Sequence, residues 1–180
     1  NNGEEDLGVE YVSSFALLGI DKEGLLSTDE KLEVLIARNA WQKELIWNRF
    51  SMDQLGMSIS QPDKVRRSSQ TISVGNTGNW STKNYLPMGC LKNKETDSIL
   101  FWQIEQNGSW YWEISDQDGH MYLQLSGPTE HQSHWWKNLK PGDTFASVPV
   151  SVGSACGDVE EAAGELTKYR RAIRRKNEDR

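Results

Sequence analysis

The feature that most constrains the fold is a series of short, strand-length segments separated by polar connections that contain glycine or proline. Segments with alternating or continuous hydrophobicity cover residues 10–18, 31–36, 45–50, 70–74, 98–105, 110–115 and 121–126. This length and period are typical of β-strands. The connections 106–109 and 116–120 are short enough for hairpins, so we expect the last three segments to form an antiparallel meander. The predicted fold class is therefore mainly β and antiparallel.

The remaining connections differ in character. Residues 140–143 have the composition of a tight turn, and we expect a strand over 144–152 at a sheet edge or bulge because it contains Pro149. Residues 75–87 are rich in Gly and Asn, which predicts a long loop, and such loops often carry function. We expect 61–69 to be a mobile polar connection and 1–8 to be a disordered segment or tail.

The hydrophobic period changes once, near the C-terminus. Apolar residues from Val159 to Ile173 recur at helical spacing, which predicts an amphipathic helix. Asp158 is placed as its N-cap, and Glu161 three residues later completes a capping box. The cations that follow suit the C-terminal end of a helix dipole. We therefore expect 158–180 to be a linker helix that follows a β domain over 9–157.

The charge distribution excludes several functions. The net charge is −6, and residues 168–180 carry seven cations and two anions, which leaves −11 on the rest. An acidic body repels phosphate backbones, so we expect no nucleic-acid partner. No apolar run is long enough to span a bilayer, so no membrane partner is expected. Cys90 and Cys156 have no metal or disulfide spacing, which permits a reducing compartment, and we expect a cytoplasmic location.

The sequence contains no arrangement of side chains that is typical of a catalytic site. No nucleophile motif or glycine-rich phosphate loop is present, and the histidines and candidate carboxylates lack the spacing of a metal site or a facing acid pair. The histidines are His120, His131 and His134, and the carboxylates are Glu113, Asp116 and Asp118. We therefore predict no catalytic residues, no metal site and no cofactor in this chain.

Aromatic recognition is the chemistry that remains. The chain has eight tryptophans. Trp110 and Trp112 share one strand face and are expected to pack in the core. Trp135 and Trp136 are further candidates for stacking. Trp80 lies among Asn, Gly, Ser and Thr, and the pattern leaves packing and ligand binding both open for it.

Several blocks occur in an order that matches one family. They cover residues 72–82, 85–90, 100–105, 108–116, 123–130, 135–142 and 169–175. Across roughly 9–180 the chain resembles the N-terminal domain of bacterial α-galactosidases of glycoside hydrolase family 36. The resemblance implies part of an antiparallel β-supersandwich, followed by a linker helix into a (β/α)8 barrel that would lie beyond Arg180. Because the sequence opens with Asn1 rather than Met and no signal-peptide pattern follows, we also expect the true N-terminus to lie upstream of Asn1.

The resemblance implies a function for the whole enzyme and a smaller one for this chain. Enzymes of the family remove terminal α-linked galactose from raffinose, melibiose and similar oligosaccharides with retention, using two barrel aspartates and no metal or organic cofactor. The implied partners are the catalytic barrel, α-galactosides and further copies in a homo-oligomer. A loop matching 75–85 shapes the galactose pocket, so the expected substrate-binding residues are Asn79, Trp80 and Ser81. The alternative is a free-standing carbohydrate-binding sandwich that uses Trp80 and the tryptophans of the meander.

Overall fold

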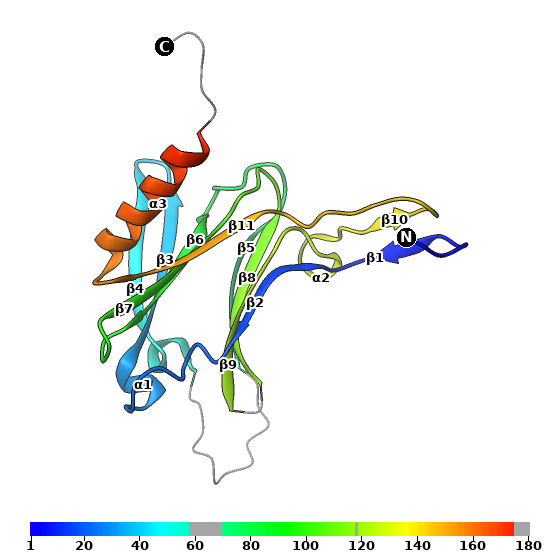
Figure 1. Ribbon diagram of the computed structural model, residues 1–180. Helices are drawn as coiled ribbons and strands as arrows, with labels where there is room; N and C mark the ends of the chain where they lie inside the picture. The colour runs from blue at the N-terminus through cyan, green and yellow to red at the C-terminus, as the bar shows by residue number, and fades with distance from the viewer. Residues whose placement is uncertain (58–69, 118, 175–180) are drawn as a thin grey trace.

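Two antiparallel β-sheets face each other, and helix α3 (Val159–Ile173) covers the outer face of one of them (Figure 1). The computed structural model describes residues 1–57, 70–117 and 119–174. Strands account for 46% of the structure and helices for 16%, and every strand pair is antiparallel. The predicted mainly β class is confirmed.

The larger sheet has five strands. In spatial order they are β11 (Val150–Cys156), β7 (Ser98–Ile104), β6 (Tyr85–Asn93), β3 (Leu32–Ala40) and β4 (Lys43–Ser51). The second sheet has four strands. They are β2 (Ser13–Leu18), β9 (His120–Ser126), β8 (Trp110–Gln117) and β5 (Thr71–Asn76).

A two-stranded arm projects from the sandwich in Figure 1 and pairs β1 (Leu7–Val9) with β10 (Lys137–Leu139). Residues 1–8 are expected from the sequence to be a disordered segment or tail, but Leu7 and Gly8 belong to strand β1. The Asn1 side-chain amide also donates a hydrogen bond to the Leu139 carbonyl at 2.8 Å. The three short helical segments are α1 (Thr28–Lys31), the 3-10 helix η1 (Asp53–Leu55) and α2 (Glu130–Ser133).

The core between the sheets is built on tryptophan. Trp110 and Trp112 point inward from β8, as their two-residue spacing predicts, and are 1% and 0% exposed. Trp102 of β7 faces them from the other sheet and packs edge to face against Trp112, with ring centroids 5.1 Å apart. The predicted core role of Trp110 and Trp112 is confirmed.

Helix α3 begins where the sequence predicts. The Asp158 carboxylate accepts the Val159 N–H at 2.7 Å, and the Glu161 carboxylate accepts the Asp158 N–H at 2.8 Å, which completes the capping box. Ala162 and Leu166 are buried against Leu35, Cys90, Ile99 and Phe101 of the five-stranded sheet. The predicted amphipathic helix is confirmed over residues 159–173.

The predicted meander is half right. Strands β8 and β9 form a hairpin, but β7 pairs with β6 and β11, so the connection 105–109 crosses from one sheet to the other. Strand β6 is an element that the hydrophobic pattern did not predict.

Two other boundaries also need correction. The strand expected over 144–152 begins only at Val150 and runs to Cys156, although it is an edge strand as predicted. The loop expected over 75–87 is shorter and covers 77–84. The helix expected over 158–180 ends at Ile173, because Arg174 has an extended backbone conformation. The expected mobile connection 61–69, Asp118 and residues 175–180 lie outside the described residues.

Candidate functional site

The loop that carries Asn79, Trp80 and Ser81 connects the two sheets. Residues 77–84 leave the four-stranded sheet at the end of β5 and enter the five-stranded sheet at the start of β6. In Figure 1 this loop lies at the upper end of the sandwich, the end toward which α3 runs. Any group presented by this loop therefore lies at one end of the sandwich rather than on a sheet face.

Hydrogen bonds hold the backbone of this loop along its length. The Gly78 N–H donates to Ser109 Oγ at 2.9 Å, and the Trp110 indole N–H donates to the Ser81 carbonyl at 2.7 Å. A turn is closed by the Lys83 N–H and the Trp80 carbonyl at 3.3 Å. Because these bonds fix the backbone before any ligand arrives, binding would cost little loop ordering.

The second support of the loop is a single residue of the five-stranded sheet. The Asn39 side-chain amide donates to the Thr82 carbonyl at 2.6 Å, and the Asn39 backbone N–H donates to the Asn84 carbonyl at 3.0 Å. Asn39 lies near the end of β3, just before the hairpin to β4. It therefore ties loop 77–84 to that hairpin.

The three predicted site residues are differently placed. Asn79 is exposed, Trp80 is 64% exposed and Ser81 is partly buried. The sequence left packing and ligand binding open for Trp80, and its exposure rules out a core position in this chain. Ser81 contributes its backbone carbonyl to the contact with Trp110.

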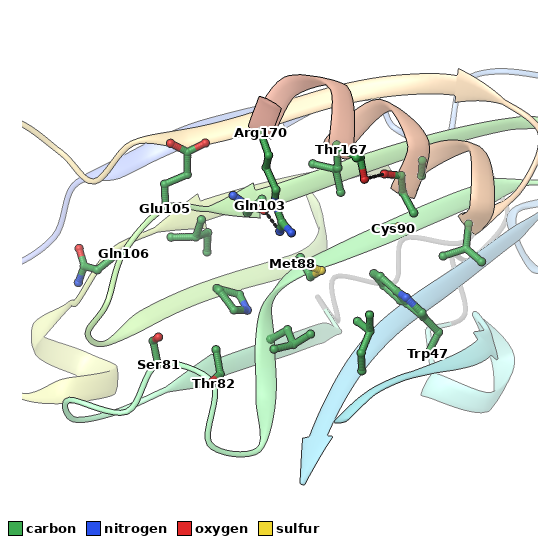
Figure 2. Close-up of a pocket in the computed structure, with 18 of the residues that line it drawn as sticks. Trp47, Ser81, Thr82, Met88, Cys90, Gln103, Glu105, Gln106, Thr167 and Arg170 are labelled. Atoms are coloured by element: carbon green, nitrogen blue, oxygen red, sulfur yellow. Dashed lines mark hydrogen bonds between the residues drawn. The ribbon is translucent and has the colours of Figure 1, made fainter. Parts of the chain in front are cut away.

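A groove begins beside Ser81 and runs between α3 and the five-stranded sheet (Figure 2). Its volume is about 650 Å³, and Trp47, Met88 and Leu166 give it an apolar interior. Its lining includes Ser81 from the loop and Val159 from the start of α3. Neither Asn79 nor Trp80 lines the groove, so the predicted site residues do not all face one cavity.

Three polar side chains of the groove, Gln103, Glu105 and Arg170, are paired within the chain. Arg170 reaches from α3 to the Gln103 amide oxygen, with its Nε at 3.0 Å (Figure 2). Glu105 accepts the Tyr169 hydroxyl at 2.7 Å. Burial raises the pKa of the Cys90 thiol to about 12, with a smaller contribution from Asp158, so this thiol stays protonated near neutral pH. Cys90 is therefore not an activated nucleophile.

The candidate carboxylates of β8 lie away from this groove. Glu113 accepts hydrogen bonds from the Tyr111 and Tyr122 hydroxyls at 2.5 and 2.8 Å. Burial and the Glu113 charge raise the pKa of nearby Tyr11 to about 12. Asp116 accepts the Gln70 N–H at 2.9 Å. Both carboxylates therefore accept hydrogen bonds within this chain, and they do not face each other across a cavity.

The histidines were considered as metal ligands from the sequence. His134 lies 3.9 Å from the Glu130 carboxylate at the end of α2. In the part of the chain that the structure describes, no three His, Cys, Asp or Glu side chains are grouped as a metal site would require. No helix among the described residues is long and apolar enough to cross a membrane.

A strongly exposed tryptophan that the sequence analysis did not single out is Trp41, at the tip of the β3–β4 hairpin. It is 87% exposed and lies two residues after Asn39, which holds loop 77–84. Its signal in the sequence is the one that drew attention to Trp80, a tryptophan with polar residues beside it between two strand-like segments.

Comparison with known proteins gives a likeness in fold. No family model and no curated protein matches the sequence. The galactosidase domain of an α-galactosidase–sucrose kinase, AgaSK, superposes with a TM-score of 0.65 at 19% identity, over 87% of this chain and 19% of that chain. The α-galactosidase from Lactobacillus brevis gives a TM-score of 0.67 at 15% identity, over 94% and 20% of the two chains. The glycoside hydrolase family 36 α-galactosidase AgaA from Geobacillus stearothermophilus gives 0.62 at 16%, over 87% and 19%.

These matches define the class of fold. The chain has a β-sandwich fold that occurs as part of α-galactosidases, and it spans about a fifth of the length of the solved structures it matches. The fold implied by the family resemblance is thereby confirmed. At these identities the likeness concerns the fold alone.

Proposed function

We propose that this chain is the non-catalytic N-terminal part of a retaining α-galactosidase. Such an enzyme would hydrolyse terminal α-linked galactose from oligosaccharides such as melibiose and raffinose, with its catalytic aspartates on a barrel domain. The observation that carries the proposal is the fold shared with α-galactosidases over 87–94% of this chain and about a fifth of theirs. The unpaired cysteines Cys90 and Cys156 fit the proposed cytoplasmic location.

Within that enzyme the chain would help to form the mouth of the active site and the oligomer. The proposed substrate-binding residues are Asn79, Trp80 and Ser81. The support for this role is the anchored backbone of loop 77–84, which presents Trp80 with 64% of its surface exposed. No metal or organic cofactor is part of the proposal.

Two measurements test this function. The purified 180-residue chain should release no product from a chromogenic α-galactoside above a buffer blank, because the catalytic aspartates of the proposed enzyme lie on its barrel domain. In the enzyme extended through its catalytic barrel, Trp80→Ala should lower kcat/KM about tenfold to a hundredfold, taking base stacking as a proxy for stacking on a sugar.

The matched control for that variant is Trp136→Ala. Trp136 is also 64% exposed but lies next to β10 on the projecting arm, so kcat/KM should stay at the value of the unmodified enzyme. Turnover by the isolated chain would contradict the non-catalytic role. Equal kcat/KM for the unmodified enzyme and Trp80→Ala would remove the loop from the substrate site.

The alternative function is a free-standing carbohydrate-binding module. The observation that favours it is that Trp80 is presented by a loop whose anchors all lie within this chain. The coding sequence that follows Arg180 separates the two proposals, since only the first requires a barrel with two catalytic aspartates.

A further inference from the structure

Two exposed tryptophans lie at the same end of the sandwich. Trp41 is 87% exposed at the tip of the β3–β4 hairpin, and Trp80 is 64% exposed on loop 77–84. Both segments lie at the upper end of the sandwich in Figure 1. A tryptophan with most of its surface exposed is uncommon in a folded chain because its large apolar surface favours burial, so two such residues at one end point to a binding role.

One residue joins the two segments that carry these tryptophans. Asn39 donates hydrogen bonds to the Thr82 carbonyl at 2.6 Å and to the Asn84 carbonyl at 3.0 Å. Trp41 lies two residues after Asn39, and Trp80 lies two residues before Thr82. The two indoles therefore project from one hydrogen-bonded unit rather than from independent loops.

The hairpin tip holds Trp41 away from the sheet. Ala40 pairs with Lys43, so Trp41 and Gln42 form the two-residue turn. Gln42 has a φ of 60°, and its N–H donates to the Glu44 carboxylate at 3.1 Å, which fixes this turn. A side chain at such a tip has no strand neighbour to cover it, and this accounts for the exposure of Trp41.

The surroundings of the two indoles suit a neutral polyhydroxyl ligand. The side chains next to them in the chain include the amides Gln42 and Asn79, which can both donate and accept hydrogen bonds. Lys43 and Glu44 carry opposite charges on the hairpin, and loop 77–84 adds Lys83, so neither segment presents a cluster of like charges. Flat aromatic faces with a few polar groups around them are the usual composition of small-ligand sites.

We propose that Trp41 and Trp80 form a two-tryptophan platform that binds successive units of a neutral oligosaccharide, with Trp41 contacting units beyond the first two. The proposal rests on the proposed function in taking loop 77–84 to face carbohydrate. It goes further by naming Trp41 as the residue that determines preference for chain length. Asn39 is a positioning residue, because it acts through the backbone of loop 77–84.

The experiment titrates the ¹⁵N-labelled 180-residue chain with melibiose, raffinose and stachyose and follows the indole N–H signals by NMR. Tryptophan-to-phenylalanine variants assign the signals of Trp41, Trp80 and Trp136. We expect stachyose to shift the signals of Trp41 and Trp80, and melibiose to shift that of Trp80 alone. The Trp136 signal serves as the control, because that indole is as exposed as Trp80 but lies next to the arm, and it should not move.

The sugar affinities of variants then show how much each tryptophan contributes to binding. Trp41→Ala should weaken stachyose binding about tenfold and leave melibiose binding unchanged, whereas Trp80→Ala should weaken both. Asn39→Ala retains both indoles but releases loop 77–84 from the hairpin, so it should reduce the preference for stachyose over melibiose.

The outcomes separate the platform from the function on which it rests. If Trp80→Ala weakens binding and Trp41→Ala does not, the platform is wrong while the role of loop 77–84 stands. If no sugar moves the Trp41 or Trp80 signal, the platform is overturned, whereas the galactosidase proposal is then decided by kinetics of the extended enzyme. Concentration-dependent self-association of the chain that Trp41→Ala abolishes, without sugar binding, would also overturn the platform and assign this end to protein contacts.

Discussion

The contrast between Trp80 and Trp110 gives the most direct test of how loop 77–84 is built. Trp110 is 1% exposed, fills the core between the sheets and donates its indole N–H to the Ser81 carbonyl at 2.7 Å. Trp110→Ala removes this volume and this donor together. Large-to-small changes of a buried tryptophan cost about 3–5 kcal/mol in free energy of unfolding. For a chain of this size that corresponds to a fall in Tm of roughly 6–20 °C.

Trp80→Ala should behave differently, although Trp80 lies in loop 77–84 and Trp110 donates a hydrogen bond to the same loop. Trp80 is 64% exposed, so its truncation removes little buried surface. Exposed substitutions usually stay within about 0.5 kcal/mol, which predicts a change in Tm of at most about 2 °C. The two variants should therefore differ in Tm by several degrees or more.

Thermal unfolding followed by circular dichroism measures both variants under one condition. Trp110→Phe is the intermediate case, because it keeps an aromatic ring in the core but removes the donor to Ser81 and part of the ring volume; loss of the donor alone costs about 1–3 kcal/mol. Trp136→Ala, equally exposed on the arm side, is the control for Trp80→Ala. A fall in Tm for Trp80→Ala as large as that for Trp110→Ala would refute the reasoning and assign Trp80 to packing.

Two further predictions concern the rest of the sandwich. Asp158→Ala should lower the free energy of unfolding by about 1 kcal/mol near neutral pH, because the N-cap is lost. Although burial alone would raise the pKa of the Asp158 carboxyl, hydrogen bonds from Arg49 and the Val159 N–H lower it below 3.8. The contribution is thus complete above that value and is lost as the pH falls through the folded-state pKa, where urea unfolding of the two proteins should converge. Gly89→Ala should cost about 1–3 kcal/mol in the same assay, since its Cβ would lie 2.5 Å from the Trp102 ring, whereas Gly8→Ala meets no atom within 4 Å and should leave stability unchanged.

Local patterns predicted the elements whose contacts are local. The start of α3 was predicted correctly because Asp158 and Glu161 satisfy the first N–H groups of the helix from within four residues. The β8–β9 hairpin was predicted for the same reason, since its two strands meet across one short turn at Gly119. In both cases the partners of the backbone groups lie close together in the sequence.

The sequence pattern did not predict strand β6, because its alternation of apolar and polar residues is interrupted. The residues that interrupt it are explained only by their contacts in the folded structure. Gly89 stands where the Trp102 ring lies across the neighbouring strand, so no larger side chain fits. Lys92 is buried although charged, because its ammonium group pairs with Asp97 and donates to the Gly157 carbonyl, each at 2.5 Å. A glycine and a lysine inside a buried strand give no hydrophobic period to detect.

The connection between β7 and β8 was also predicted wrongly, because its course depends on strands that lie far away in the sequence. Residues 105–109 have the composition of a hairpin turn, but Trp102 and Trp112 face each other from different sheets. The choice between a hairpin and a crossover depends on which strands supply the other edges, β6 for β7 and β5 for β8. Those partner strands are distant from residues 105–109 in the sequence, whereas a turn is predicted from the few residues that form it.

The candidate site combines both kinds of contact, which explains why only half of it could be predicted. Trp80 was found because a tryptophan in an Asn-rich loop is unusual by itself, whereas the significance of Trp41 depends on the contact of Asn39 with Thr82, 43 residues away in the sequence. The anchors of the loop belong to different sheets, Trp110 to the four-stranded one and Asn39 to the five-stranded one. The relative position of the two exposed indoles is therefore fixed by how the two sheets pack. Since that packing is filled by buried tryptophans, the same residue type forms the core and the proposed binding surface, and a change to the core should alter the spacing of the platform.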